Sequence, residues 1–121
     1  MMKKLAAALF FLMTAASFAD HYDKEEHMLE NKLYNNFPVL EEGKNIEVKE
    51  IEVDIEKNGR VEIDVEFARN SQVDTKNYKI YADKIASSVN DMLKEMNGDF
   101  VLTKIEIDTS GIKDDKEIFR Y

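Results

Sequence analysis

The sequence contains no cysteine. This absence excludes disulfide bonds, thiolate metal sites, cysteine nucleophiles and lipid attachment at an N-terminal cysteine. Glycine is scarce as well, with 4 residues in 121, and no glycine-rich loop of the kind that binds phosphate is present. Chemistry that depends on thiols or on glycine-rich nucleotide loops is therefore excluded.

Positive charge is in short supply. The chain has 17 Lys and Arg against 25 Asp and Glu, and its formal net charge is −8. Nucleic acids and anionic membrane surfaces are bound through basic patches. The charge balance therefore argues against both of these partners.

Long apolar segments are also missing. The run Leu5–Met13 is too short for the roughly 20 residues of a transmembrane helix, and no second run follows it, so we predict no transmembrane segment. Lys3 and Lys4 precede the run and the small-x-small sequence Ser17–Ala19 follows it, which is the pattern of a secretory signal peptide. An uncleaved anchor or a buried core helix is the competing interpretation. We predict a cleaved signal peptide at residues 1–19 and a periplasmic or secreted bacterial protein.

Removal of residues 1–19 from the 121 leaves 102 residues, and because that piece carries two lysines and no acid, the formal net charge falls from −8 to −10. A chain of this length can bury a core of its own. We therefore predict one acidic, soluble domain over residues 20–121.

Two helices are predicted from the spacing of apolar residues. A short N-terminal helix has Tyr22, Leu29 and Leu33 near one face and ends before Pro38. A long helix starts at a cap supplied by Asp74 or Thr75 and ends at Asn97-Gly98. Its apolar stripe repeats in steps of three and four residues and is predicted to face the core: Tyr78, Tyr81, Ile85, Val89, Met92 and Met96.

The segment 51–67 alternates apolar and mostly acidic residues on both sides of Asn58-Gly59, which is typical of a β-hairpin. A two-residue loop would place Ile55 opposite Glu62 and mix the two faces. A three-residue loop, Lys57–Gly59 with Gly59 left-handed, keeps every apolar residue on one face, and we predict this register. It forms the pairs Ile55–Val61, Val53–Ile63 and Ile51–Val65.

The alternation changes phase upstream of the hairpin. Ile46 and Val48 have even numbers, whereas the core-facing residues that follow have odd ones. A bulge at Lys49-Glu50 restores the facing of both halves.

A third strand is predicted at FVLTKIEIDT, with Val101, Ile105 and Ile107 on its core face. Its position beside the first hairpin strand would give an antiparallel sheet of order 2-1-3, with the long helix on one face. The last residues form a short fourth edge strand or a tail. The predicted class is α+β: a small antiparallel sheet of three to four strands on one long helix, with a short N-terminal helix.

The matching pieces VEIDVEF, the helix through MLKEMNG, and FVLTKIEIDTSGI cover about two thirds of residues 20–121. In this layout the chain resembles the alkaline-shock protein family, in which a V-x-I-x-V strand leads to a long helix and a final alternating strand. The order of elements is also similar to BON-type domains of the cell envelope, which are thought to bind phospholipid or proteins, although the long helix fits that family less well. The export signal departs from the alkaline-shock family, whose members look cytoplasmic or membrane-associated from inside. The resemblance implies a fold and carries over no functional residue.

The predicted register gathers carboxylates on the other face of the hairpin. Glu52 lies opposite Asp64 and Asp54 lies opposite Glu62, so like charges face each other at two successive positions, which is destabilising. Hard cations such as Ca²⁺ and Mg²⁺ prefer several carboxylate ligands, and these four residues are the candidate metal site. A solvated face that resists edge pairing is the alternative, and a cationic partner surface is a third. Glu56, Glu66, Glu106 and Asp108 are predicted to extend this face.

The two histidines lie near the predicted N-terminus. Asp23 and His27 are four residues apart on one helical face, an arrangement that suits zinc or copper, but two ligands do not complete a site. Exposed polar residues near a frayed end are the alternative interpretation for His21 and His27.

Catalytic signatures are sparse. The serines at 71, 87, 88 and 110 are in no nucleophile elbow, and the paired carboxylates look exposed rather than buried in a cleft. We predict a non-enzymatic binding or structural protein of the bacterial envelope without a cofactor, with divalent-cation binding as the alternative. A cationic or protein partner and a homo-oligomer through free sheet edges remain open.

Overall fold

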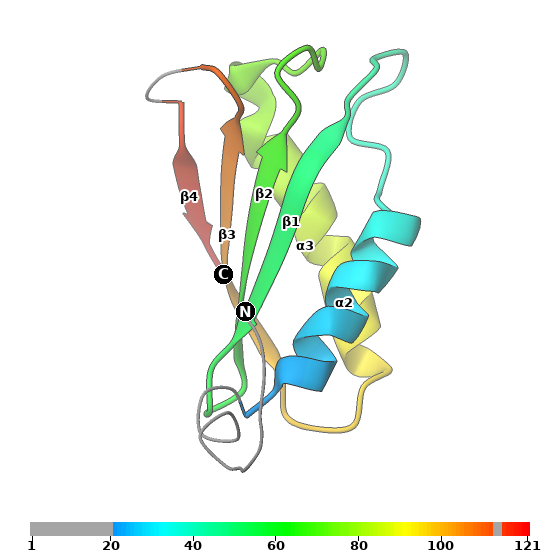
Figure 1. Cartoon of the computed structure of the whole chain (residues 1–121), viewed down its shortest axis with the longest axis vertical. Coiled ribbons are helices and arrows are strands. Elements are labelled where there is room, and N and C mark those ends of the chain that lie inside the picture. Colours follow the sequence, from blue (N-terminus) through cyan, green and yellow to red (C-terminus); the bar gives the residue numbers. More distant parts are fainter. Residues whose placement is uncertain (1–20, 113–114) are drawn as a thin grey trace, which may run out of the picture.

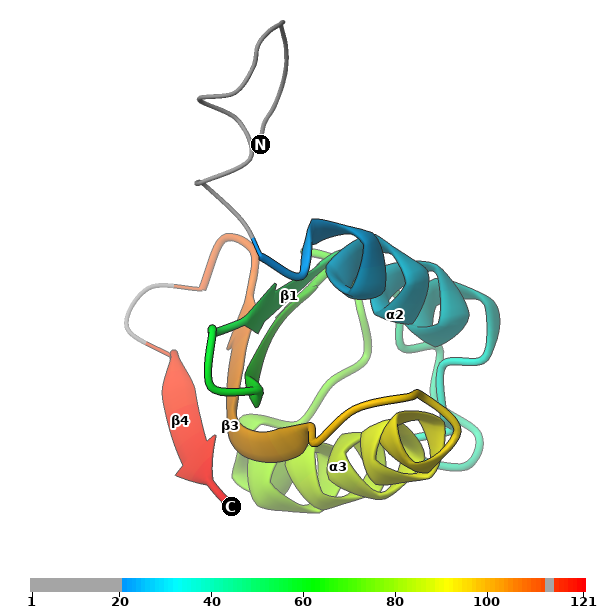
Figure 2. The ribbon, with the colours of Figure 1, turned by 90° about the horizontal axis from the view of Figure 1, so that it is seen from below.

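A computed structural model of the chain describes residues 21–112 and 115–121. The predicted signal peptide, residues 1–19, lies outside the described residues. Within them α3 lies across one face of a single four-stranded sheet, and α2 runs alongside β1 (Figure 1 and Figure 2). The α+β class is thereby confirmed. None of the described helices is long and apolar enough to cross a membrane. In chain order the elements are α2 (Asp23–Asn35), β1 (Val48–Ile55), β2 (Arg60–Phe67), the 3₁₀ turn η2 (Thr75–Asn77), α3 (Tyr78–Lys94), β3 (Val101–Thr109) and β4 (Glu117–Arg120).

The hairpin formed by β1 and β2 has the predicted register. The loop closes through Gly59 N, which donates to Glu56 O over 2.8 Å, and Gly59 has φ +88°, in the left-handed region. The register shifts between Val48 and Glu50, so the predicted bulge is confirmed. The apolar partners across the hairpin are Ile51–Val65, Val53–Ile63 and Ile55–Val61, and the acidic partners are Glu52–Asp64 and Asp54–Glu62.

The predicted strand order 2-1-3 is wrong. The sheet has the order β1-β2-β3-β4, and it is mixed, because β3 pairs with β2 in parallel while the other two pairings are antiparallel. The crossover through α3 returns the chain to the strand it has just left, and the free edge of β1 is occupied by α2 (Figure 1). The edge strands are therefore β1 and β4, and not the second and third strands as predicted. Because α2 covers the edge of β1, self-association through a free sheet edge would have to involve β4.

The core-facing residue at the start of β3 also differs from the prediction. A register shift between Val61 and Glu62 of β2 leaves Thr103 of β3 as an extra residue. Leu102 is consequently buried, whereas Val101 is 60% exposed. Ile105 and Ile107 lie in the core as predicted.

The core lies between the sheet and the two helices. Phe67 from β2 contacts the rings of Tyr78 and Tyr81 on α3, with ring centroids 6.2 and 5.9 Å away. The first four residues of the predicted stripe are buried, whereas Met92 and Met96 are only partly buried. Met96 lies beyond the end of α3, and Leu93 is the buried residue of the last turn.

Candidate functional site

The outer face of the sheet, opposite α3, carries the predicted carboxylates. Register places Asp64 of β2 between Glu52 of β1 and Glu106 of β3. Glu62 lies between Asp54 of β1 and Lys104 of β3. Three acidic residues are therefore neighbours in one cross-strand row, because alternate residues of each strand point to the same face.

Helix α2 forms a wall beside this face. A surface hollow of about 400 Å³ lies between them and contains all four residues of the predicted metal site. It also contains Asp23 and His27, which the sequence suggested as a separate pair. The structure therefore joins two groups of candidate ligands in one place, which we call the acidic hollow. Its lining residues are Asp23, Glu26, His27, Glu30, Glu52, Val53, Asp54, Glu62, Asp64 and Lys104.

The surroundings of Asp64 disfavour the ionised form of its carboxyl group. Partial burial, and then the neighbouring charge of Glu106, raise the pKa of Asp64 from 3.8 to about 6, with Glu52 adding to the effect and Lys104 opposing it. Desolvation and like charge both penalise the ionised form of a carboxyl group. Burial together with Glu66 likewise raises the pKa of Asp108.

Three lysines partly offset the negative charge. Lys104 Nζ lies 3.4 Å from Glu62 Oε1, and Lys116 Nζ lies 3.4 Å from Glu106 Oε2. Lys49 Nζ lies 3.7 Å from Glu66 Oε2. No ion pair among the described residues engages Glu52, Asp54 or Asp64. These three lysines therefore do not neutralise the carboxylates along β1 and in the middle of β2.

One set of three carboxylates in the described part of the chain has oxygens close enough for a shared cation. Asp54, Glu56 and Glu62 can each present an oxygen within 4.8 Å of the others. Glu52 and Asp64, the other two residues of the predicted site, lie in the acidic hollow but outside this set. His27 Nε2 lies 3.8 Å from Asp23 Oδ1, and both side chains are more than half exposed.

A row of side chains on α2, which the sequence pattern did not indicate, caps the free edge of β1. The N–H groups of Ile51, Val53 and Ile55 point away from β2 and find acceptors on the helix. Each acceptor is four residues from the next, so the three lie on one face of α2. The bonds are Ile51 N to Tyr34 Oη (2.7 Å), Val53 N to Glu30 Oε2 (2.9 Å) and Ile55 N to Glu26 Oε2 (2.7 Å).

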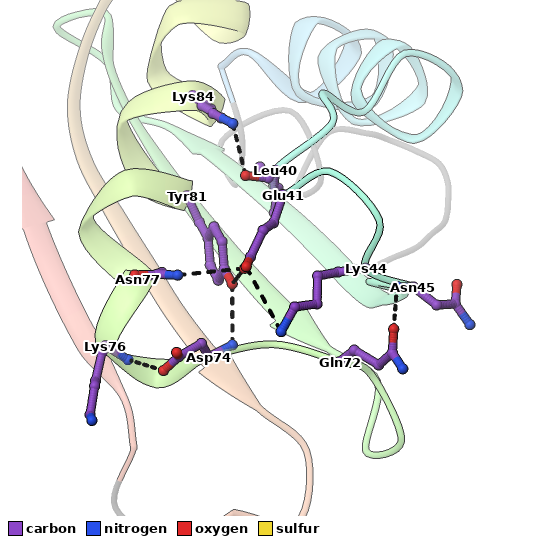
Figure 3. Close-up of polar contacts among 10 residues, drawn as sticks. All are labelled: Leu40, Glu41, Lys44, Asn45, Gln72, Asp74, Lys76, Asn77, Tyr81 and Lys84. Carbon is purple, nitrogen blue, oxygen red and sulfur yellow. Dashed lines mark hydrogen bonds and ion pairs between the residues drawn. The ribbon is translucent and has the colours of Figure 1, made fainter.

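A second polar cluster fastens the chain connectors to α3 (Figure 3). Tyr81 Oη donates to Glu41 Oε1 over 2.6 Å and accepts from Asp74 N over 3.2 Å. Lys84 Nζ donates to Leu40 O over 2.8 Å. The bond from Tyr81 holds the pKa of Glu41 below its usual value, and burial raises that of Tyr81. A tyrosine that is harder to ionise and an already ionised carboxylate serve as an anchor, and we assign this cluster a structural role.

The chain matches no protein-family model, and no curated protein and no solved structure matches it either. The resemblance to the alkaline-shock and BON-type domains therefore rests on the layout of elements alone.

Proposed function

We propose that this chain is a small exported, non-enzymatic binding protein of the bacterial envelope, and that the acidic hollow binds a cationic partner. The observation that carries the proposal is that Glu52, Asp54 and Asp64 line the acidic hollow and engage in no ion pair among the described residues. Burial, and then the charge of Glu106, raise the pKa of Asp64, so its ionised form costs free energy in the folded protein. A partner that brings positive charge to Asp64 and its neighbours would recover part of that free energy, and complementary charge also accelerates encounter.

The chemistry of the remaining polar residues supports a binding role rather than catalysis. Ser71 Oγ accepts a hydrogen bond from Glu47 N over 2.8 Å and joins two connectors. His27 lies at the exposed rim of the hollow, paired with Asp23. The N-terminal pattern of Lys3 and Lys4, an apolar run and a small-x-small sequence supports the proposal of export.

The binding proposal is tested with a peptide of alternating lysine and serine, measured by calorimetry at low and high salt. The double variant Asp54→Asn with Asp64→Asn removes two charges from the acidic hollow and should weaken binding. The variant Glu42→Gln with Asp91→Asn removes two charges at exposed positions elsewhere and is the matched control. Equal weakening by both variants would show that net charge, and not this surface, governs the interaction.

A second candidate function is divalent-cation binding, favoured by the three convergent carboxylates Asp54, Glu56 and Glu62. Ca²⁺ prefers six to eight oxygen ligands, so three side chains would be supplemented by water or by Glu52 and Asp64 at the same surface. Millimolar Ca²⁺ should raise the melting temperature of the protein, and Asp54→Asn with Glu62→Gln should abolish the rise. An unchanged melting temperature in Ca²⁺, Mg²⁺ and Zn²⁺ would exclude this function.

A further inference from the structure

Helix α2 occupies the place of a fifth strand at the β1 edge. Four helical residues advance about 6 Å and two strand residues advance about 6.6 Å, so acceptors spaced by four can follow alternate N–H groups of a strand. Glu26, Glu30 and Tyr34 use this match to satisfy three consecutive outward N–H groups of β1. A carboxylate accepts hydrogen bonds but has no proton to give to the outward carbonyl groups of the same strand.

The attachment of α2 involves the core as well as the β1 edge. The side chains of Leu29 and Leu33 are fully buried in the core, and the ring of Tyr22, just before the helix, packs against Phe100 with ring centroids 5.2 Å apart. A strand that takes the place of α2 must therefore supply apolar side chains as well as hydrogen bonds. Lys32 Nζ lies 3.8 Å from Glu95 Oε1 just beyond α3, an exposed ion pair of the kind that contributes little. The connector that follows is fastened to α3 at Leu40 and Glu41, so residues 36–39 link α2 to the part of the domain that stays in place.

We propose that α2 is a displaceable cap and that the β1 edge beneath it is a docking site for an extended polypeptide segment, which adds to the sheet as a strand. An added strand supplies acceptors for the outward N–H groups of β1 and also donors for its outward carbonyl groups, which the carboxylates of α2 cannot supply. The edge offers the 8 residues of β1.

The two faces of β1 determine the chemistry of this partner. Ile51, Val53 and Ile55 point to the core side and call for apolar residues at alternate positions. Glu52 and Asp54 point to the outer face and call for lysine or arginine at the positions between. A second copy of β1 would instead place acid against acid, which is destabilising. The partner is therefore a strand that alternates apolar and basic residues, a choice that rests on the proposed role of the acidic hollow.

The test uses two synthetic peptides of 8 residues, the length of β1, that alternate valine and lysine. The second peptide is N-methylated at its valines, which removes the N–H groups that would face β1 and leaves charge and apolar surface unchanged. We expect only the first to bind. In hydrogen exchange, it should keep the amides of Ile51 and Val53 protected while those of Leu29 and Leu33 in α2 lose protection.

Two variants weaken the cap without touching the apolar core. Tyr34→Phe and Glu30→Met each remove one acceptor and should each tighten peptide binding about fivefold, because the peptide competes with the docked helix. Glu30→Gln removes the same charge as Glu30→Met but keeps an acceptor, and it should not tighten binding. Continued protection of the Ile105 amide verifies that the sheet remains folded in every variant.

The outcomes separate this inference from the proposed function. Equal binding of both peptides, with α2 still protected, would overturn strand addition and leave binding at the acidic face intact. Failure of both peptides, and of the lysine–serine peptide, would overturn both proposals.

Discussion

Replacing Asp64 with asparagine should stabilise the protein at neutral pH. The rise in the pKa of Asp64 from 3.8 to about 6, caused by burial and by Glu106, means that its ionised form is disfavoured in the folded state. A difference of this size corresponds to about 3 kcal/mol, and solvent screening at a partly exposed surface reduces it to about 1 to 2 kcal/mol. For a domain of this length, the melting temperature should rise by about 5 °C or more.

The pH dependence gives the sign of the effect. Above pH 6, Asp64 is ionised in both the folded and unfolded states, and its full destabilising contribution is present. As the pH falls from about 6 to about 4, the folded state takes up the proton first, so stability is gained. Glu41 and Asp83 act in the opposite sense, because hydrogen bonds from Tyr81 and Lys79 lower their pKa values, and their contribution is lost as the pH falls below about 4.

Urea denaturation at pH 7 and pH 4 measures both predictions. Asp64→Asn should raise the free energy of unfolding at pH 7 and have little effect at pH 4, where the native side chain is already neutral. Asp91→Asn, which removes one charge from an exposed site on α3, controls for net charge. An equal gain at both pH values, or a loss at pH 7, would refute the account of the acidic row.

Three further substitutions test particular contacts by the same denaturation assay. Glu26→Ala should destabilise the protein by about 2 kcal/mol, because it leaves the buried N–H of Ile55 without its acceptor. Glu26→Gln keeps an acceptor and should lose much less stability, so equal losses in the two variants would contradict the capping role. Gly59→Ala should cost at least about 2 kcal/mol, because the residue has φ +88° and the added Cβ would lie 2.2 Å from Asp99 O, so a neutral result would refute the loop geometry. Tyr78→Phe should cost about 1 to 2 kcal/mol, because the hydroxyl bonds both Thr109 and Asp115 over 2.6 Å, and an unchanged midpoint would count against that network.

The hairpin was predictable because its determinants are local. Alternation of apolar residues with period two, a single Asn58-Gly59 signal and the phase change at Lys49-Glu50 leave one register that buries every apolar side chain. The facing of the carboxylates follows from that register without further information. The pairs Glu52–Asp64 and Asp54–Glu62 are therefore consequences of the apolar pattern.

The strand order was not predictable in this way. Placement of β3 beside β1 or beside β2 depends on which edge is free, and the edge of β1 is closed by α2. The acceptors Glu26 and Glu30 look like ordinary solvent-exposed residues in the sequence. Their spacing of four residues, continued by Tyr34, is a signal only once the strand opposite is known. The sequence did not indicate that α2 forms one wall of the acidic hollow, because its position beside β1 is also known only from the structure.

The order β1-β2-β3-β4 has a kinetic consequence, because every strand pairs with the one next to it in the chain. Each pairing closes only the segment between consecutive strands, so the entropy lost on loop closure is small at every step. Proteins built from such short-range pairings fold faster than those that join distant segments. The hairpin of β1 and β2 is the shortest of these closures, and we expect it to form early, before the α2 cap docks along its edge.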